Sequence, residues 1–363
     1  MSKLILCGIV LTQSSWVIAT SRGQGFAHEP TFAQIQEAEL ANAEYHLHAT
    51  FPQTRPFRPV EDTAQFAYVL MSATENSDEV TNLRRTIAQN LPSGVKLVIL
   101  ADASDADSVR AEYSKWISPD RLILATDVST EDGFWARDSF PVPVYDNASK
   151  KASLVAAHYY RDGFTSWDAI AASVHAPLAQ KGFTFVGGNL LADADGTCFS
   201  VDSYRLFTVT AADLAQAYGC RQQHLMPHLH GIGDVDEVLK PLPGRRILTN
   251  TPEYKPTLEK WGYQVVLLPT LAEEFRTYAN ALIVNKTAFM PTYGVTQDAQ
   301  ARRVYESLGY KVVGIPTIGL SDDMHGSIHC QTMAYPPMRL SDLLASLHVR
   351  ELVAKPLVQS QIQ

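Results

Sequence analysis

Short apolar runs alternate with amphipathic segments along most of the chain. In the first half, runs typical of buried strands occupy residues 66–71, 95–100 and 121–126, and amphipathic segments separate them at residues 79–91 and 106–116. The segment 79–91 repeats its apolar residues every three or four positions, which gives a helix one apolar face. This pattern predicts successive strand–helix–strand units.

The same alternation returns in the second half. Strands are predicted at residues 246–249, 263–268, 282–284 and 311–315, and helices at residues 252–261 and 297–308. Between residues 140 and 221 short strands and turns dominate, which include an Asp-Gly turn at residues 192–196. Recurring strand and helix pairs predict an α/β fold. Because no linker rich in proline, glycine or serine divides the chain after residue 60, we expect one main domain.

The first 21 residues resemble a short secretory signal peptide. A lysine at position 3 precedes the apolar residues 4–11, and Ala19-Thr20-Ser21 offers a cleavage site of small residues. A buried first strand is the alternative, whereas a membrane span would need a longer apolar run. We expect a signal peptide at residues 1–21, an N-terminal extension at 22–56 that forms a polar connector, and the main domain at 57–363. The expected location is secreted or periplasmic, or cytoplasmic if residues 1–21 are no signal.

Composition and charge narrow the class of partner. The chain has 363 residues, of which 46% are hydrophobic and 19% charged, so it can bury a large core. Its formal net charge of −8 argues against nucleic-acid binding, because phosphate contacts need a basic surface. The acidic balance favours a cationic small molecule or a basic peptide.

Four cysteines are too few for a disulfide framework in a chain of this length. If a signal peptide carries Cys7 away, then Cys198, Cys220 and Cys330 remain. A Cys198–Cys220 bridge and two free buried cysteines are both open alternatives. In either case Cys330 is a single thiol.

Short motifs whose residues could take part in catalysis follow one another at wide spacing. They are Trp-Ala-Arg-Asp at residues 135–138, Gly-Gly-Asn at 187–189, Gly-Asp-Val-Asp at 233–236, Tyr-Ala-Asn at 278–280 with Met-Pro-Thr-Tyr-Gly at 290–294, and Ile-His-Cys at 328–330. A thiolate is a nucleophile, and carboxylates pair well with a planar cation that carries several N–H donors. Each motif alone is unspecific, but their order is informative.

In this order the motifs resemble those of the agmatine deiminase and peptidylarginine deiminase families of the pentein superfamily. The resemblance covers about residues 57–340. It implies a five-bladed α/β propeller, a closed ring of ββαβ-type units with the active site at its centre. It also implies a deiminase, in which a thiolate attacks the guanidinium carbon, an amine leaves and water resolves the thiouronium intermediate.

The resemblance assigns roles to individual residues. Cys330 matches the nucleophile, and Asp138 and Asp236 match the carboxylates that bind the guanidinium. Asn189 is expected to hold the glycine turn, Trp135 to lie in the core, and Arg137 to pair with a neighbouring carboxylate or to contact substrate. The candidate substrate-binding residues are thus Asp138, Asp236, Arg137, Asn189 and Trp135.

Position 234 departs from the family pattern. The family has a histidine two residues before the second aspartate, where this chain has Asp234. That histidine donates a proton to the departing amine and then activates water, which needs a group that titrates near the operating pH. An ordinary aspartate is too acidic, but like-charge repulsion from Asp138 and Asp236 could raise its pKa and make Asp234 the catalytic acid.

Several histidines lie near these motifs. His228 and His230 precede the Gly-Asp-Val-Asp motif at positions that do not match the family histidine, and His325 is expected to face solvent. His329 belongs to the Ile-His-Cys motif and is expected to be structural. His224, His228 and His230 could hold a metal, but a polar loop is favoured, and we expect no metal and no organic cofactor.

Three functional interpretations remain open. The first is a working deiminase that acts on agmatine, free arginine or peptidyl-arginine. The second is a pseudoenzyme that binds an arginine-like group through Asp138 and Asp236 without turnover. The third is an amidinotransferase, in which an amine instead of water resolves the intermediate. A homo-oligomer is compatible with all three.

Overall fold

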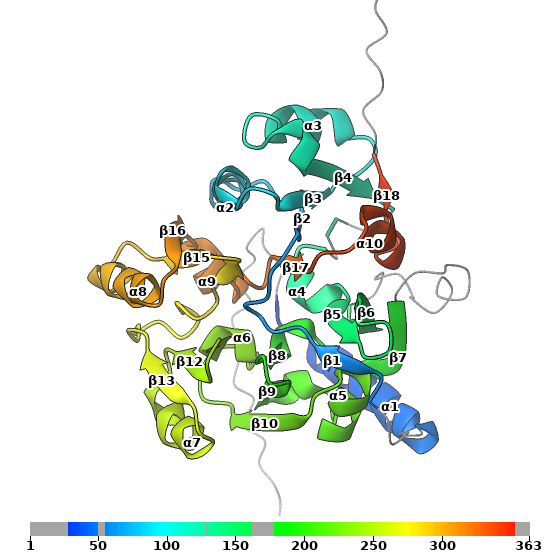
Figure 1. Cartoon of the computed structure of the whole chain (residues 1–363), viewed down its shortest axis with the longest axis vertical. Helices are drawn as coiled ribbons and strands as arrows, with labels where there is room; N and C mark the ends of the chain where they lie inside the picture. Colours follow the sequence, from blue (N-terminus) through cyan, green and yellow to red (C-terminus); the bar gives the residue numbers. More distant parts are fainter. Residues whose placement is uncertain (1–27, 50–54, 128–129, 132, 162–177, 353–363) are drawn as a thin grey trace, which may run out of the picture.

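The computed structural model describes residues 28–49, 55–127, 130–131, 133–161 and 178–352, so the expected signal peptide at residues 1–21 lies outside the described part. Five small sheets surround a common centre, and helices cover the outside of the ring (Figure 1). The predicted five-bladed α/β propeller is confirmed. Within the described ranges, no helix has both the length and the apolar character that a membrane span requires.

Each sheet forms one blade of the ring. The first blade joins β17 (Met333–Tyr335), β2 (Tyr68–Ser72), β3 (Lys96–Leu100), β4 (Leu122–Thr126) and β18 (Arg350–Glu351). The second joins β1 (Phe57–Pro59), β5 (Val142–Asp146), β6 (Ala152–His158) and β7 (Leu178–Thr184). The third joins β8 (Leu191–Ala192), β9 (Thr197–Asp202) and β10 (Gln222–Pro227). The last two join β11 (Leu239–Leu242), β12 (Arg246–Thr249) and β13 (Gln264–Leu267), and β14 (Leu282–Val284), β15 (Thr287–Thr292) and β16 (Lys311–Pro316).

Helices connect the strands within and between blades. The α-helices are α1 (Phe32–His48), α2 (Asp78–Asn90), α3 (Ala106–Tyr113), α4 (Ala136–Ser139), α5 (Ala211–Tyr218), α6 (Val235–Val238), α7 (Lys255–Lys260), α8 (Thr296–Ser307), α9 (Ile318–Met324) and α10 (Leu340–Ser346). Short 3-10 turns are η2 (Pro119–Arg121), η4 (Gly187–Asn189), η5 (Tyr204–Leu206) and η6 (Pro252–Tyr254).

The blades repeat one pattern of strand pairing. An inner strand pairs antiparallel with the next strand of its sheet, as β11 does with β12, and that strand pairs parallel with a third, as β12 does with β13. A parallel pair needs a crossover, and helices such as α7 and α8 supply it. In the first blade the inner strand is β17, which comes from the other end of the chain and pairs Met333 with Leu70 of β2. The ring is therefore closed by its C-terminal part.

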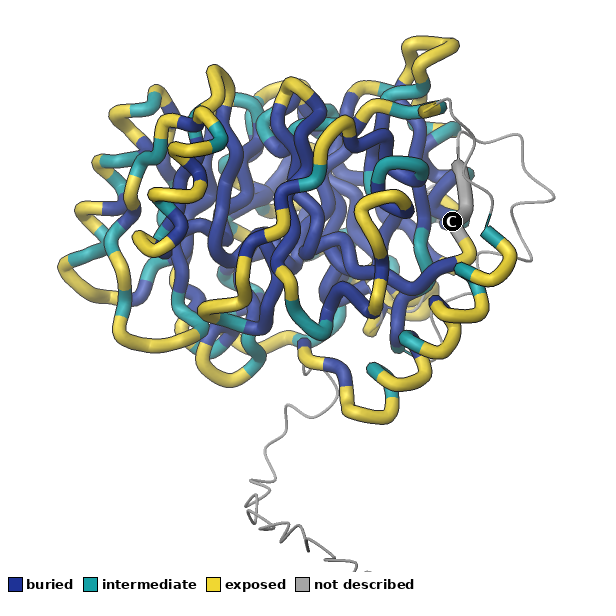
Figure 2. The backbone as a smooth tube through the Cα atoms, turned by 90° about the horizontal axis from the view of Figure 1, so that it is seen from below, coloured by how far each residue is buried: buried dark blue, intermediate teal, exposed yellow. Residues whose placement is uncertain are grey.

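The hydrophobic pattern located most elements closely. The predicted strands at 246–249 and 282–284 match β12 and β14, and the predicted helix at 79–91 matches α2 within one residue. These strands are buried on both sides in the interior of the ring, whereas the turns and outer helices are exposed (Figure 2). A continuous apolar run is what such burial requires.

The extension at 22–56 is not a simple connector, because it contains helix α1. A capping box between Thr31 and Gln34 begins this helix. Only Ala38 and Asn42 of its residues are buried, so it lacks the apolar stripe that reveals a packed helix. Asn42 instead exchanges hydrogen bonds with the backbone of Thr184, donating at 3.0 Å and accepting at 2.6 Å, which fixes α1 beside β7.

The two alternatives for the buried cysteines are decided by a Cys198–Cys220 disulfide. It joins β9 to the segment just before β10, inside the apolar core of the third blade. Cys330 is the remaining free thiol among the described residues.

Candidate active site

A short turn with polar residues precedes the inner strand of every blade. Among these residues are Asp138 before β5, Asn189 before β8, Asp236 before β11, Asn280 before β14 and Cys330 before β17. All five residues are buried. Residues far apart in sequence therefore converge because the blades repeat, and this convergence brings together the nucleophile and both aspartates that the motifs predicted.

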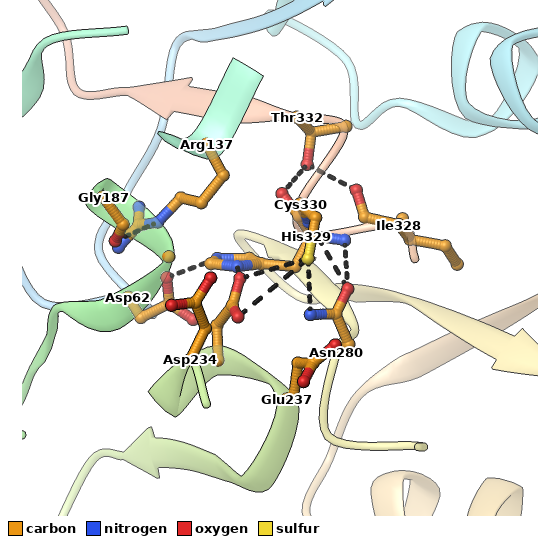
Figure 3. A network of polar contacts seen from close by, with 12 residues as sticks. Asp62, Arg137, Gly187, Asp234, Glu237, Asn280, Ile328, His329, Cys330 and Thr332 are labelled. Atoms are coloured by element: carbon orange, nitrogen blue, oxygen red, sulfur yellow. Dashed lines mark hydrogen bonds and ion pairs between the residues drawn. The ribbon is translucent and has the colours of Figure 1, made fainter. Parts of the chain in front are cut away.

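Cys330 lies at the centre of this group and is completely buried. The side-chain amide of Asn280 donates to its sulfur at 3.0 Å, and the sulfur lies 3.6 Å from Oδ2 of Asp236 (Figure 3). Burial raises the pKa of the Cys330 thiol well above its usual range, and the negative charges of Asp236 and Glu237 add to the shift. Without a bound cation, Cys330 is a protonated thiol at neutral pH.

A chain of charged groups orients Asp236. Nδ1 of His329 lies 2.7 Å from Asp236, and Nε2 of His329 lies 3.0 Å from Asp62, which also binds Lys240 at 2.7 Å. Both ring nitrogens face carboxylate oxygens, so the ring links Asp236 to Asp62. Burial opposes ionisation of Asp62, but Lys240 and His329 outweigh it and hold the pKa of Asp62 well below its usual range. These contacts agree with the structural role expected for His329, whose ring lies beside Asp62 in Figure 3.

A second buried cluster surrounds Asp138. Oδ1 of Asp138 accepts a hydrogen bond from the backbone of Gly188 at 3.0 Å, and Oδ2 binds Arg205 at 2.5 Å and His28 at 2.7 Å. The guanidinium of Arg205 also donates to Oδ1 of Asp234 at 2.7 Å. The chain's own arginine thus joins the predicted guanidinium-binding carboxylate to the residue that replaces the family histidine.

Gly188 is required for this arrangement. A β-carbon at position 188 would lie 2.6 Å from Oδ1 of Asp138 and 2.9 Å from Oδ2 of Asp234, which is closer than atoms pack. The Gly-Gly-Asn motif therefore leaves space for two carboxylates beside the backbone.

The two aspartates of this cluster have opposite electrostatic character. Burial opposes ionisation of Asp138, but Arg205 and His28 outweigh it and hold the pKa of Asp138 far below its usual range. Burial raises the pKa of Asp234 to about 8, and the charge of Asp138 adds to this shift while Arg205 opposes it. Oδ2 of Asp234 has no hydrogen-bond partner among the described residues. Asp234 can therefore hold a proton near neutral pH, as the sequence predicted, although burial exceeds charge repulsion as the cause.

Three predicted site residues are tied to their surroundings instead of open to the centre. Arg137 donates to the backbone oxygens of Gly187 at 3.1 Å and Leu190 at 2.6 Å. Asn189 exchanges hydrogen bonds with the backbone of Val201, and Trp135 is buried in the core. These contacts favour a supporting role for all three over contact with substrate, and Arg137 donates to backbone oxygens where a carboxylate partner was expected.

The histidines considered as replacements lie elsewhere. His228 binds the backbone oxygen of Gly231, and His224 stacks on Trp261 with ring centres 3.8 Å apart. His325 stacks on Phe275 at 3.7 Å and pairs with Glu29 at 3.1 Å, so its ring is only partly solvent-facing. Sequence reasoning missed His28 and Arg205, because both lie in segments that carried no motif.

One group of side chains has the geometry of a metal site. Ligand atoms of His28, Asp138 and Asp234 lie within 4.8 Å of one another, which is the one such group in the described ranges. The guanidinium of Arg205 already binds both carboxylates, and its charge would repel a metal ion. The donor set thus fits an internal arginine better than a metal.

Part of this chain matches a family of known proteins. A family described as Porphyromonas-type peptidyl-arginine deiminase matches residues 255–336, a range that includes Asn280 and Cys330. No curated protein matches the chain.

Solved structures of similar fold carry deiminase names. An agmatine deiminase from C. jejuni has 15% identity and a TM-score of 0.64, and the match covers 80% of this chain and 99% of that one. The agmatine deiminase of Enterococcus faecalis has 16% identity and a TM-score of 0.59, with 79% and 99% covered. The resemblance predicted from the motifs is confirmed: the chain has the pentein fold of the agmatine and peptidyl-arginine deiminases, and its C-terminal part matches the Porphyromonas-type family.

Proposed function

We propose that the protein is a guanidine-modifying hydrolase, a deiminase, in which Cys330 is the nucleophile. The observation that carries this proposal is the distance of 3.6 Å between the Cys330 sulfur and Asp236 at the centre of the ring. A guanidinium bound to Asp236 would place its carbon next to the sulfur. The deiminase names of proteins with this fold support the reaction class.

The substrate's own charge would activate the thiol. In the resting site, burial and the charges of Asp236 and Asp138 keep Cys330 protonated. A guanidinium cation offsets those negative charges, so the thiolate becomes accessible when substrate is bound. Asn280, which donates to the sulfur, would stabilise the thiolate.

The proposed reaction has two stages. The thiol proton passes to a neighbouring carboxylate, a bond forms between sulfur and the guanidinium carbon, and one nitrogen takes a proton and leaves as ammonia. Water then attacks the thiouronium carbon and the carbon–sulfur bond breaks. This step forms the ureido product, regenerates the thiol and releases one proton. Asp234 is the proposed proton donor to the departing nitrogen, because it can hold a proton near neutral pH.

Binding without turnover is the second candidate. Arg205 already binds Asp138 at 2.5 Å, so one of the two predicted guanidinium-binding carboxylates has an internal partner. A site with one free carboxylate would hold a guanidino ligand less tightly and orient it less well.

The test is release of ammonia and of a ureido product from agmatine, free arginine and an arginyl peptide. We expect one of these substrates to be turned over, and Cys330→Ala to abolish the release. Absence of product, together with a melting temperature that rises with these ligands, would favour the binding function. A product that forms only with an added amine acceptor would identify amidino transfer. Asp234→His restores the family residue, and a large gain in turnover would show that this departure limits the enzyme.

We also propose a location outside the cytoplasm. The Cys198–Cys220 disulfide supports it, because structural disulfides persist in oxidising compartments. Fractionation of cells that express the full chain would test this location.

A further inference from the structure

His28 reaches the active site from outside the ring. It precedes α1 in the N-terminal extension, yet its side chain is completely buried beside Asp138. Its ring stacks on Trp135 with centres 4.1 Å apart, and its backbone oxygen accepts hydrogen bonds from Arg205 at 3.0 Å and Tyr160 at 2.5 Å. Both the side chain and the backbone of His28 are therefore part of the site.

Hydrogen-bond partners define the protonation of the ring. Nδ1 of His28 lies 2.9 Å from the backbone oxygen of His325, which can only accept, and Nε2 lies 2.7 Å from the Asp138 carboxylate. Burial lowers the pKa of His28 below its usual value; Asp138 opposes this shift, and the charge of Arg205 adds to it. Both ring nitrogens nevertheless face acceptors, and a neutral ring would leave one of them without a proton, so these contacts favour the charged ring.

The two carboxyl groups of the cluster are bound very differently. Asp138 accepts hydrogen bonds from three donors, namely Gly188, Arg205 and His28, which is the environment of an ionised carboxylate. Asp234 accepts one, from Arg205, and its Oδ2 has none among the described residues. Because Arg205 binds both carboxyl groups, the asymmetry comes from the backbone of Gly188 and the side chain of His28, and His28 is the member of this pair that can carry charge.

We propose that His28 is a positioning residue that makes Asp138 the ionised member of this pair and leaves Asp234 as the protonated one. A histidine thus still serves the acid–base function, but it acts through Asp138 instead of occupying position 234. The effect of His28 on turnover rests on the proposed deiminase function. The ionised state of Asp138 and the protonated state of Asp234 do not depend on that function. The charged and titratable groups that face His28 are Asp138, Arg205, Asp234, Tyr160, Glu29 and His325.

The test is carbon-13 NMR of the aspartate carboxyl groups as a function of pH, with Asp138→Asn and Asp234→Asn to assign the signals. In the wild type, the titration of the pair near neutral pH is expected almost entirely at Asp234. His28→Gln keeps an N–H donor but removes the charge, and a substantial part of the titration is expected to move to Asp138. A titration that stays on Asp234 in His28→Gln, or that lies on Asp138 in the wild type, would overturn the proposal.

His46→Asn is the matched control. His46 lies on α1 and pairs with Asp213 at 2.8 Å, so it anchors the same N-terminal segment outside the site. Its replacement is expected to leave the carboxyl titration unchanged; if it shifts the titration as His28→Gln does, the effect is one of anchoring and the proposal fails.

Kinetics supply the second readout. If the wild type turns over a guanidino substrate, His28→Gln is expected to raise KM about tenfold, because a protonated Asp138 binds the cation less well, and to lower kcat as Asp234 loses its proton. Unchanged kinetic constants in an active protein would overturn the role of His28. A wild type without turnover would contradict only the proposed function, since the NMR result does not depend on activity.

Discussion

The side chain of Asn280 connects Cys330, the proposed nucleophile, to the turn that carries it. Its Nδ2 donates to the sulfur of Cys330 at 3.0 Å, while its Oδ1 accepts from the backbone N–H of His329 at 3.0 Å. One amide thus fixes both the sulfur and the peptide before it, and in the proposed reaction it would stabilise negative charge on the sulfur.

Replacement of this amide should therefore impair the chemical step. We expect Asn280→Ala to lower kcat roughly 100-fold, because the thiolate loses a donor and its turn loses an anchor. Steady-state kinetics on the substrate found active will check this. Asn90→Ala is the control, since Asn90 bonds only the backbone of Thr86 at the end of α2. Equal losses in both variants would refute the role of Asn280.

The charge of the site predicts how Cys330 reacts with alkylating reagents. Because burial and Asp236 raise the pKa of the thiol, alkylation by iodoacetamide should be slow at neutral pH and should accelerate as the pH rises. A guanidino ligand that is not turned over should accelerate alkylation at constant pH, because its charge favours the thiolate. Mass spectrometry will locate the modification, with Cys330→Ser as control; ligand protection without any acceleration would contradict substrate activation.

The raised pKa of Asp234 also predicts how stability depends on pH. The folded protein binds the Asp234 proton up to about pH 8, whereas an unfolded aspartate releases it near pH 4, so this group's contribution to stability decreases as the pH rises between these values. Asp234→Asn has no such proton to lose. Its melting temperature relative to the wild type should therefore increase from pH 5 to pH 8, and a constant difference would show that Asp234 is ionised throughout.

The sequence allowed the fold and the centre of the site to be predicted for one physical reason. Buried strands need continuous apolar runs, and the functional residues directly precede such runs at Asp138, Asp236 and Cys330. His28 and Arg205 could not be found in this way, because neither belongs to one of the motifs that precede the inner strands. Their contacts with Asp138 join residues that are 110 positions apart for His28 and 67 positions apart for Arg205.

Removal of the disulfide should destabilise the third blade. The bond closes a segment with a sequence separation of 22, and loss of such a constraint costs about 3 kcal/mol of unfolding free energy. We expect the double variant Cys198→Ser, Cys220→Ser to unfold at lower denaturant concentration, and a reducing agent to have the same effect on the wild type. The wild type could instead keep its stability under reduction while the double variant is destabilised. In that case the loss of stability comes from poor packing of the serines and not from loss of the disulfide.

The internal arginine offers a direct test of the guanidinium-binding property of the site. Arg205→Ala leaves Asp138 and Asp234 as buried neighbours without their shared cation, which should lower the unfolding free energy by about 3–5 kcal/mol. Millimolar guanidinium should restore part of the lost melting temperature by filling the vacated space between the two carboxylates. Arg339→Ala removes an exposed partner of Asp342 and is the control that should respond neither in stability nor to the added cation. If guanidinium lowers the melting temperature of both variants alike, the Asp138 and Asp234 pair does not bind the free cation. The pair would then bind the guanidinium of Arg205 only because that group is covalently attached to the chain.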